Sequence, residues 1–264
     1  MNKYSKSYTI ILDDMEYSQY RLRPISAIMY IQDAFARYTA TKKMAAYDLF
    51  ATKQYWIVTE FNIDFVDLLP FWSEEIKVEI WVSEVSKLKV YTDFNIYHDD
   101  KIFAKGNALW FVIDKNSKRP AKTDVVMERF EICNELAIGN HTKFLIPETK
   151  DKCGEIKHTI NLSDMDFNNH VNNKSYMNIA ETTVPEEFKK NNVIKQIKVK
   201  FNRETFLNDV LTCSAYKTDT ESLYVHKIEK DGISVCDIVT LWQQKQNTEN
   251  IVDYTMKIKE EIDI

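Results

Sequence analysis

Residues 163–176 read SDMDFNNHVNNKSY, and the helix that this stretch opens decides the fold. From residue 173 to residue 184 apolar side chains recur at helical spacing, and Pro185 ends the pattern because proline cannot continue a helix. Asn172 or Asn173 is a suitable N-cap, since a short amide side chain accepts hydrogen bonds from the unpaired N–H groups of a helix start. One face of the expected helix carries Tyr176, Ile179, Ala180 and Thr183.

The same order of elements occurs earlier in the chain. A helical pattern spans residues 24–38, and Pro24 stands where an opening helix tolerates proline. Its expected inner face carries Ile25, Ile28, Met29, Gln32 and Phe35. Segments rich in β-branched and aromatic residues follow each helix and predict strands. They are residues 57–66, 75–85, 89–97 and 105–114 in the first half, and 194–203, 210–218, 222–230 and 234–244 in the second.

Trp110 and Trp242 occupy matching places in the last strand of each set. A helix followed by four strands, found twice, predicts a duplicated α+β domain in which an antiparallel sheet wraps a central helix. We expect an N-terminal domain at residues 1–123, a linker at residues 124–154 and a C-terminal domain at residues 155–264. The linker begins with a short helical pattern at residues 125–136.

Composition excludes several classes of function. The 264 residues carry a formal net charge of −5, which gives no support to nucleic-acid binding. No apolar run is long enough for a membrane span, and the polar residues 1–8 lack a signal-peptide core, so we expect a cytoplasmic protein. The four cysteines and five histidines show no metal-ligand spacing, and the chain has no Gly-rich phosphate loop. We therefore expect neither a metal nor a cofactor.

The polar run before the second helix suggests acyl chemistry. Asp166, Asn168 and His170 alternate, so in an extended segment their side chains would fall on one side. The unpaired N–H groups of the following helix start are positively polarised and can hold an oxyanion. Together these groups suit hydrolysis of an activated acyl group. Capping and turn formation explain any one of these residues, but not the whole run.

The run also resembles the D-x-N-x-H-V-N-N-x-x-Y signature of the acyl-acyl carrier protein thioesterase family of plants and bacteria, here at residues 166–176. Residues 8–39, 108–120 and 199–205 resemble further segments of that family, so the similarity spans nearly the full chain. The resemblance implies two tandem hot-dog domains, the hydrolysis of fatty acyl-acyl carrier protein and the release of free fatty acid.

The same resemblance implies a catalytic set of Asp166, Asn168, His170 and Glu204. In this interpretation Glu204 activates water together with His170, Asn168 positions substrate or water, and Asp166 holds the imidazole. Direct attack by a carboxylate, giving an anhydride, is an open alternative. Thr205 stands where the family has a cysteine, which removes a Cys/His mechanism at this position. Without the resemblance, Glu204 would be interpreted as a solvated strand residue.

The remaining expected contacts concern the substrate. Backbone amides from Val171 through Asn172 to Asn173 would bind the oxyanion. The first half has no comparable polar cluster, and the family's acyl pocket lies there, so its apolar residues are candidate pocket residues, with plain core packing as the alternative. These candidates are Met29, Phe35, Trp56, Phe61, Phe65 and Trp81.

An acidic carrier protein would need a basic docking surface. The second half offers Lys189, Lys190, Lys195, Lys198, Lys200 and Arg203. The competing functions are an acyl-coenzyme A thioesterase, a hot-dog dehydratase or hydratase, and a non-catalytic acyl-binding module. The sequence leaves both a monomer and a homodimer open.

Overall fold

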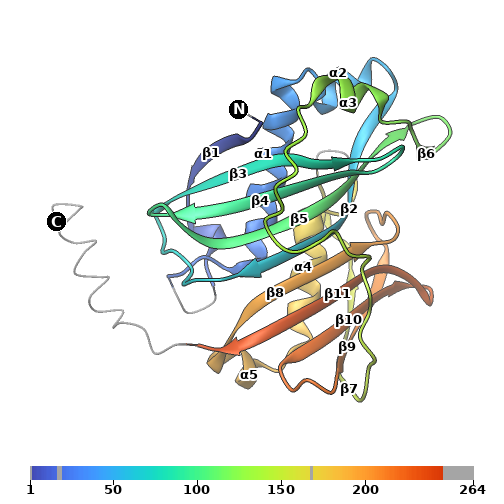
Figure 1. The fold of residues 1–264 in the computed structure, drawn as a ribbon. Coiled ribbons are helices and arrows are strands. Elements are labelled where there is room, and N and C mark those ends of the chain that lie inside the picture. Colours follow the sequence, from blue (N-terminus) through green and yellow to red (C-terminus); the bar gives the residue numbers. More distant parts are fainter. Residues whose placement is uncertain (1, 17–19, 167–168, 246–264) are drawn as a thin grey trace.

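The computed structural model describes residues 2–16, 20–166 and 169–245, which form two similar halves (Figure 1). The first half contains β1 (Tyr4–Thr9), α1 (Ala27–Thr41), α2 (Ala46–Phe50), β2 (Gln54–Phe65), β3 (Glu75–Val85), β4 (Val90–His98), β5 (Lys101–Asp114), β6 (Arg119–Pro120) and α3 (Asp124–Arg129). The second half contains β7 (Lys152–Thr159), α4 (Asn173–Thr182), α5 (Glu186–Asn191), β8 (Asn192–Phe201), β9 (Val210–Lys217), β10 (Leu223–Lys230) and β11 (Ile233–Gln244). Short 3₁₀ turns, η1 (Leu12–Asp14), η2 (Pro24–Ser26) and η3 (Leu162–Asp164), precede the two long helices.

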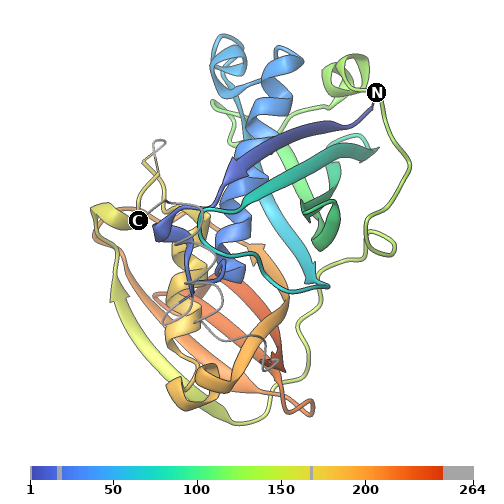
Figure 2. The same cartoon turned by 90° about the vertical axis from the view of Figure 1, so that its left-hand side faces the viewer.

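One continuous antiparallel sheet joins the halves, in the order β1-β3-β4-β5-β2-β8-β11-β10-β9-β7. Read from its two edges inward, the order is the same in each half, with β7 in the place of β1 and β8 in the place of β2. The halves meet where β2 pairs with β8, from Glu60 opposite Lys200 to Asp64 opposite Gln196. The curved sheet encloses α1 and α4 (Figure 2). The predicted duplication and the α+β class are thus confirmed.

The two helices are buried to different extents. On α4 the predicted face is confirmed, because Tyr176, Ile179 and Ala180 are all buried. On α1 the buried surface is wider than the single face that the sequence predicted. Ile31 and Ala34 are fully buried, because α1 has the sheet on one side and α4 on another. Among the described residues no helix is long and apolar enough to cross a membrane.

The linker is an extended strap, residues 130–151, that crosses β3 and β4 on the outer face of the first half (Figure 1). The predicted helix at 125–136 is shorter than expected, since α3 ends at Arg129 and Phe130 is extended. The strap is held by its own backbone: Cys133 N–H donates to Val82 O at 2.9 Å, and Glu135 O accepts from the Trp81 indole at 2.8 Å. Its last contact is with the second half, where β7 begins at Lys152.

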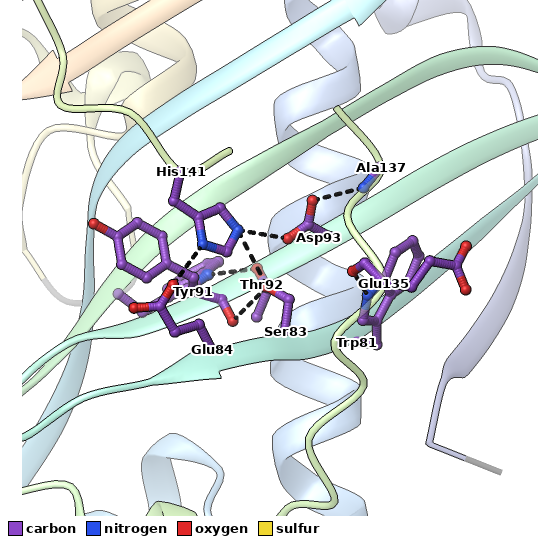
Figure 3. A network of polar contacts seen from close by, with 10 residues as sticks. Trp81, Ser83, Glu84, Tyr91, Thr92, Asp93, Glu135, Ala137 and His141 are labelled. Atoms are coloured by element: carbon purple, nitrogen blue, oxygen red, sulfur yellow. Dashed lines mark hydrogen bonds and ion pairs between the residues drawn. The ribbon is translucent and has the colours of Figure 1, made fainter. Parts of the chain in front are cut away.

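His141 fastens the strap to the sheet (Figure 3). Its ring stacks on Tyr91 at 4.2 Å between centroids, and it lies between two carboxylates. Nε2 is 2.8 Å from Asp93 Oδ2 and Nδ1 is 3.0 Å from Glu84 Oε2. Burial opposes protonation of the ring, but the hydrogen bonds and charges of Asp93 and Glu84 outweigh it and raise the pKa of His141. The strap is therefore fastened most firmly when His141 is charged.

Candidate active site at the start of α4

The run before α4 forms a closed turn rather than the extended segment that its alternation predicted. Met165 bridges Val171, and Asp166 N–H donates to His170 O at 2.8 Å. Asn169 adopts a positive φ of 63°, a conformation that asparagine tolerates better than most residues. Asn168 lies outside the described residues.

Asp166 shapes this turn from within. Its Oδ1 accepts the backbone N–H of His170 at 3.1 Å, in addition to the bond that its own N–H makes to His170 O. The carboxylate thereby fixes the backbone from which the imidazole projects. Its contact with the backbone was not visible in the sequence spacing.

His170 and Glu204 face each other across the site. Nε2 of His170 is 3.8 Å from Oε1 of Glu204, and their side chains are 31% and 42% exposed. This distance is longer than a hydrogen bond and leaves both groups accessible to water. The edge-on ring of Phe206, 5.6 Å from the imidazole centroid, closes one side of the pair.

The loop after β8 holds Glu204 between two anchored neighbours. Arg203 N–H donates to Val235 O at 3.2 Å. Thr205 is fully buried, its O accepts the Val171 N–H at 3.2 Å, and its Oγ1 lies 2.6 Å from the Tyr176 hydroxyl. A hydroxyl that is buried and already bonded is not available as a nucleophile. Thr205 instead ties the Glu204 loop to α4.

The three cysteines of the second half are equally unsuited to attack, and burial raises the pKa of the half-buried Cys153. Cys213 and Cys236 are fully buried, and burial raises the pKa of the Cys213 thiol to about 12 despite a hydrogen bond with Thr183. Thiolates are the reactive form of cysteine. The accessible groups of this site are therefore an imidazole and a carboxylate.

Most amides at the helix start are already engaged. Val171 N–H bonds Thr205 O, and Asn172 N–H donates to Asp164 O at 2.8 Å. Asn172 is the N-cap, and its Oδ1 accepts Lys174 N–H at 2.9 Å. Of the three predicted oxyanion donors, only Asn173 N–H has no hydrogen-bond partner within the described part of the chain. It lies at the positive end of the helix dipole.

The first half repeats the backbone of this turn. Three backbone hydrogen bonds recur. Asp166 N–H to His170 O (2.8 Å) corresponds to Glu16 N–H to Arg21 O (2.8 Å), and Val171 N–H to Thr205 O (3.2 Å) corresponds to Leu22 N–H to Pro70 O (2.7 Å). Asn172 N–H to Asp164 O (2.8 Å) corresponds to Arg23 N–H to Asp14 O (2.7 Å). Arg21 therefore occupies the place of His170, and Leu69 that of Glu204. The parallel between LDDME at residues 12–16 and LSDMD at residues 162–166 is the sequence signal that would have revealed this match.

Three of the predicted pocket residues form an aromatic cluster with Trp110 beside α1. Phe35 stacks on Trp110 at 3.7 Å between centroids and meets Trp56 edge-on at 5.2 Å, and Phe61 lies 6.1 Å from Trp110. Phe65 is buried in the same core, and Met29 is half-buried on α1. Trp81 points to the other face of β3, under the strap (Figure 3). It is not a neighbour of the other five.

The predicted carrier-binding residues do not form one surface. The pKa of Glu16 is raised by burial and by the nearby charge of Glu181, and it is lowered by nearby cations that include Lys189. Lys189 therefore lies beside Glu16, in the turn of the first half. Lys190 pairs with Glu187 on α5. Lys195, Lys198 and Lys200 lie along β8, where Lys200 is opposite Glu60. Arg203 alone adjoins Glu204.

Family models match both halves. The acyl-ACP thioesterase N-terminal domain matches residues 1–130 and the acyl-ACP thioesterase C-terminal domain matches residues 148–244. The chloroplastic acyl-[acyl-carrier-protein] hydrolase FATB3 of Cuphea viscosissima is 26% identical over 229 residues, covering 81% of this chain and 53% of that protein. Oleoyl-acyl carrier protein thioesterase 1 of Arabidopsis thaliana is 21% identical over 247 residues, covering 82% and 66%. The chain thus spans about half the length of the first of these relatives.

Solved structures share the fold of both halves. An acyl-ACP thioesterase from Bacteroides thetaiotaomicron superposes with a TM-score of 0.81 at 18% identity, covering 92% of this chain and 98% of that one. The 12:0-ACP thioesterase from Umbellularia californica also gives 0.81, at 15% identity, with coverages of 93% and 98%. The expected fold class, two tandem hot-dog domains, is confirmed by this likeness.

Proposed function

The chain belongs to the acyl-ACP thioesterase family, and from that membership we propose that it hydrolyses fatty acyl-acyl carrier protein to free fatty acid. The observation that supports this reaction best is the accessible pair of His170 and Glu204 beside the start of α4. An imidazole and a carboxylate within reach of one water molecule can activate it, and a helix start can stabilise the charge that develops on a carbonyl oxygen.

The reaction proceeds by addition of water and loss of the thiol. Glu204, assisted by His170, takes a proton from water as the oxygen bonds to the thioester carbon. Asn173 N–H and the α4 dipole stabilise the resulting oxyanion. When the oxyanion collapses and the carbon–sulfur bond breaks, the proton passes from Glu204 through His170 to the leaving thiolate. The products are a free fatty acid and a carrier thiol.

The other predicted site residues support this chemistry indirectly. Asp166 holds the backbone of His170 in place, and Asn168 positions water or substrate. The N–H groups of Val171 and Asn172 make hydrogen bonds within the protein and so hold the start of α4 in place. The acyl chain enters the first half beside Phe35, Trp56 and Phe61.

The partner in this proposal is acyl carrier protein. The protein acts in the cytoplasm of a cell that makes its fatty acids there. Arg203 is the one predicted carrier contact that adjoins the site, so we retain it as a contact near the thioester.

The test is a panel of acyl carrier thioesters and the matching coenzyme A thioesters, with the released fatty acids identified by mass. We expect turnover of carrier thioesters with the higher kcat/KM, and its loss in Glu204→Gln, which is nearly isosteric but cannot accept the proton. Preference for coenzyme A thioesters would indicate the acyl-coenzyme A thioesterase instead. Binding of acyl chains without hydrolysis of either substrate would indicate the non-catalytic module.

A further inference from the structure

One end of the first half carries a concentration of positive charge. We call residues 42–53 and 114–129 the basic end. Its basic residues are Lys42, Lys43, Lys53, Lys115, Lys118, Arg119, Lys122 and Arg129, and its acidic residues are Asp48, Asp114, Asp124 and Glu128. Eight cations stand against four carboxylates in a chain whose net charge is −5. Within the described residues, none of these eight cations takes part in an ion pair.

Hydrogen bonds join the two ranges of the basic end at two places. Lys115 N–H donates to Lys53 O at 2.8 Å, which connects the turn after β5 to the start of β2. The Arg129 guanidinium donates to the backbone oxygens of Lys42 and Lys43 at 3.2 and 2.8 Å, which connects α3 to the end of α1. The guanidinium of Arg129 thus bonds to backbone oxygens rather than to a carboxylate.

The carboxylates of the basic end partly serve its own turns. Asp48 accepts the Ala45 N–H at 2.9 Å, and Asp114 accepts the Ser117 N–H at 2.7 Å. Hydrogen bonds to Ser117 lower the pKa of Asp114. These two carboxylates are held within their turns, whereas the side chains of Lys115 and Lys122 are exposed.

The same end exposes apolar side chains. Tyr47 is 72% exposed, Phe50 is 70% exposed and Met127 is 53% exposed. The ammonium of Lys115 lies 5.2 Å from the Phe50 ring centroid, so charge and aromatic surface alternate. Exposed aromatic and methionine side chains framed by charges are typical of protein–protein interfaces.

Strand pairing places the start of β2, in the basic end, at the same end of the β2–β8 ladder as the loop that carries Glu204. β2 runs antiparallel to β8, with Glu60 opposite Lys200. Because the pairing is antiparallel, the chain after Lys200 continues in the direction that goes from Glu60 back to Gln54 along β2. At about 3.3 Å per residue, Glu204 is at most about 13 Å beyond this pair, and Lys53 is at most about 23 Å beyond it. The chain therefore leads to both residues in the same direction from this pair.

We propose that the acidic carrier protein docks on the basic end, with its thioester arm directed to His170 and Glu204. This inference rests on the proposed function and names the surface that its substrate uses. The opposite charges accelerate the encounter, and the exposed Tyr47 and Phe50 supply the apolar contact. The basic end replaces the lysines of α5 and β8 as the docking surface in this proposal. Of those lysines, Lys189 lies beside Glu16, at the turn without the catalytic pair.

The experiment compares two charge reversals of equal size. Lys115→Glu with Lys122→Glu alters the basic end, and Lys195→Glu with Lys198→Glu is the matched control on β8. Each is assayed with an acyl carrier thioester and with a small uncharged acyl thioester, at low and high salt, after thermal unfolding shows that it folds. The first pair should raise KM for the carrier substrate about tenfold at low salt, with the effect screened at high salt. The control, and both variants on the small substrate, should stay near wild type.

Binding of unacylated carrier protein is titrated in parallel, so docking is decided independently of turnover. A larger loss of carrier binding in the β8 pair, or equal binding by all three proteins, overturns the proposal. An equal loss on both substrates assigns Lys115 and Lys122 to the fold and overturns it as well. A wild-type protein that binds the carrier at the basic end but hydrolyses no carrier thioester would overturn the proposed function and leave the docking surface standing.

Discussion

The turns before α1 and α4 share a backbone but differ in the groups that they present. In the second half His170 faces Glu204 at 3.8 Å, and both are open to water. In the first half Arg21 covers the Phe71 ring at 4.0 Å and donates to Leu69 O at 2.6 Å, at the place that corresponds to Glu204. The comparison shows that the hydrogen bonds of the turn preserve the scaffold, whereas two side chains decide whether the turn has reactive groups.

The sharpest test of this comparison removes each side chain in turn. His170→Ala should lower kcat/KM for an acyl carrier thioester by about 10²–10⁴-fold, the usual contribution of a general acid–base group. Arg21→Ala, the matched change, should leave kcat/KM within a few-fold of wild type. Both are measured on proteins with unchanged circular dichroism. A folded His170→Ala enzyme with near-normal turnover would refute the assignment of the active turn.

The cores of the two halves differ at the equivalent positions of Phe94 and His226. Phe94 lies opposite Gly106 in the first half, and His226 lies opposite Ile238 in the second; both aromatic side chains are fully buried. His226 Nδ1 is 3.1 Å from Thr183 Oγ1 and Nε2 is 3.0 Å from Thr240 Oγ1.

The hydroxyl partners fix the tautomer of His226. Thr183 donates its own proton to Ala180 O, so it accepts from Nδ1–H. Thr240 accepts the Trp242 indole proton and donates its own to Nε2. Among the described residues no acceptor remains for a second ring proton, and burial lowers the pKa of His226 to about 4.

The second prediction follows from this neutral histidine. Its folded pKa lies below the ordinary value of 6.5, so the stability that it contributes is complete above about pH 6.5 and falls as the pH decreases toward 4. The loss amounts to about 3 kcal/mol in the free energy of unfolding. Denaturant unfolding across this range measures it. His226→Phe, which copies Phe94, should remove this component, and an unchanged slope with pH would contradict the prediction.

The third test concerns the loop that carries the carboxylate. Thr205→Val should lower the free energy of unfolding by about 1–2 kcal/mol, because it leaves the buried Tyr176 hydroxyl without its partner. Its counterpart in the first half, Pro70, makes no such bond. Turnover should fall moderately while Thr205→Ser restores stability. If Thr205→Val lost as much activity as His170→Ala, then Thr205 would belong to the chemistry.

The smallest expected effect is at the strap, which crosses the outer face of the first half. The folded pKa of His141 is raised by its two carboxylates, so its contribution is complete below about pH 6.5 and is lost as the pH rises through the folded pKa. Amide hydrogen exchange in residues 133–141 should accelerate with rising pH by more than the intrinsic pH dependence of the exchange reaction. In His141→Gln this additional rise should be absent. Equal profiles in both proteins would show that the strap is held by its backbone bonds.

The regular elements were predictable because each side of a strand or helix meets a constant environment. All eight predicted strands and both long helices are confirmed, whereas α2 and α5, with five and six residues, are too short for a periodic signal. The alternation of polar residues predicted an extended segment at Asp166, but the chain forms a turn there because Asn169 reverses its direction with a positive φ. The lysines of residues 189–203 are close in sequence, yet the ten-residue strand β8 holds its two ends about 30 Å apart.

The strap also sets how the two halves depend on one another. They share the β2–β8 pairing, and Arg23 binds Glu181 while Lys174 lies 3.3 Å from Asp14, so the interface does not need the strap for its contacts. What the strap supplies is proximity: a short tether holds its two ends at an effective concentration of the order of millimolar. A chain cut within residues 130–151 is therefore a heterodimer, whose activity falls on dilution, whereas dilution cannot separate the halves of the uncut chain.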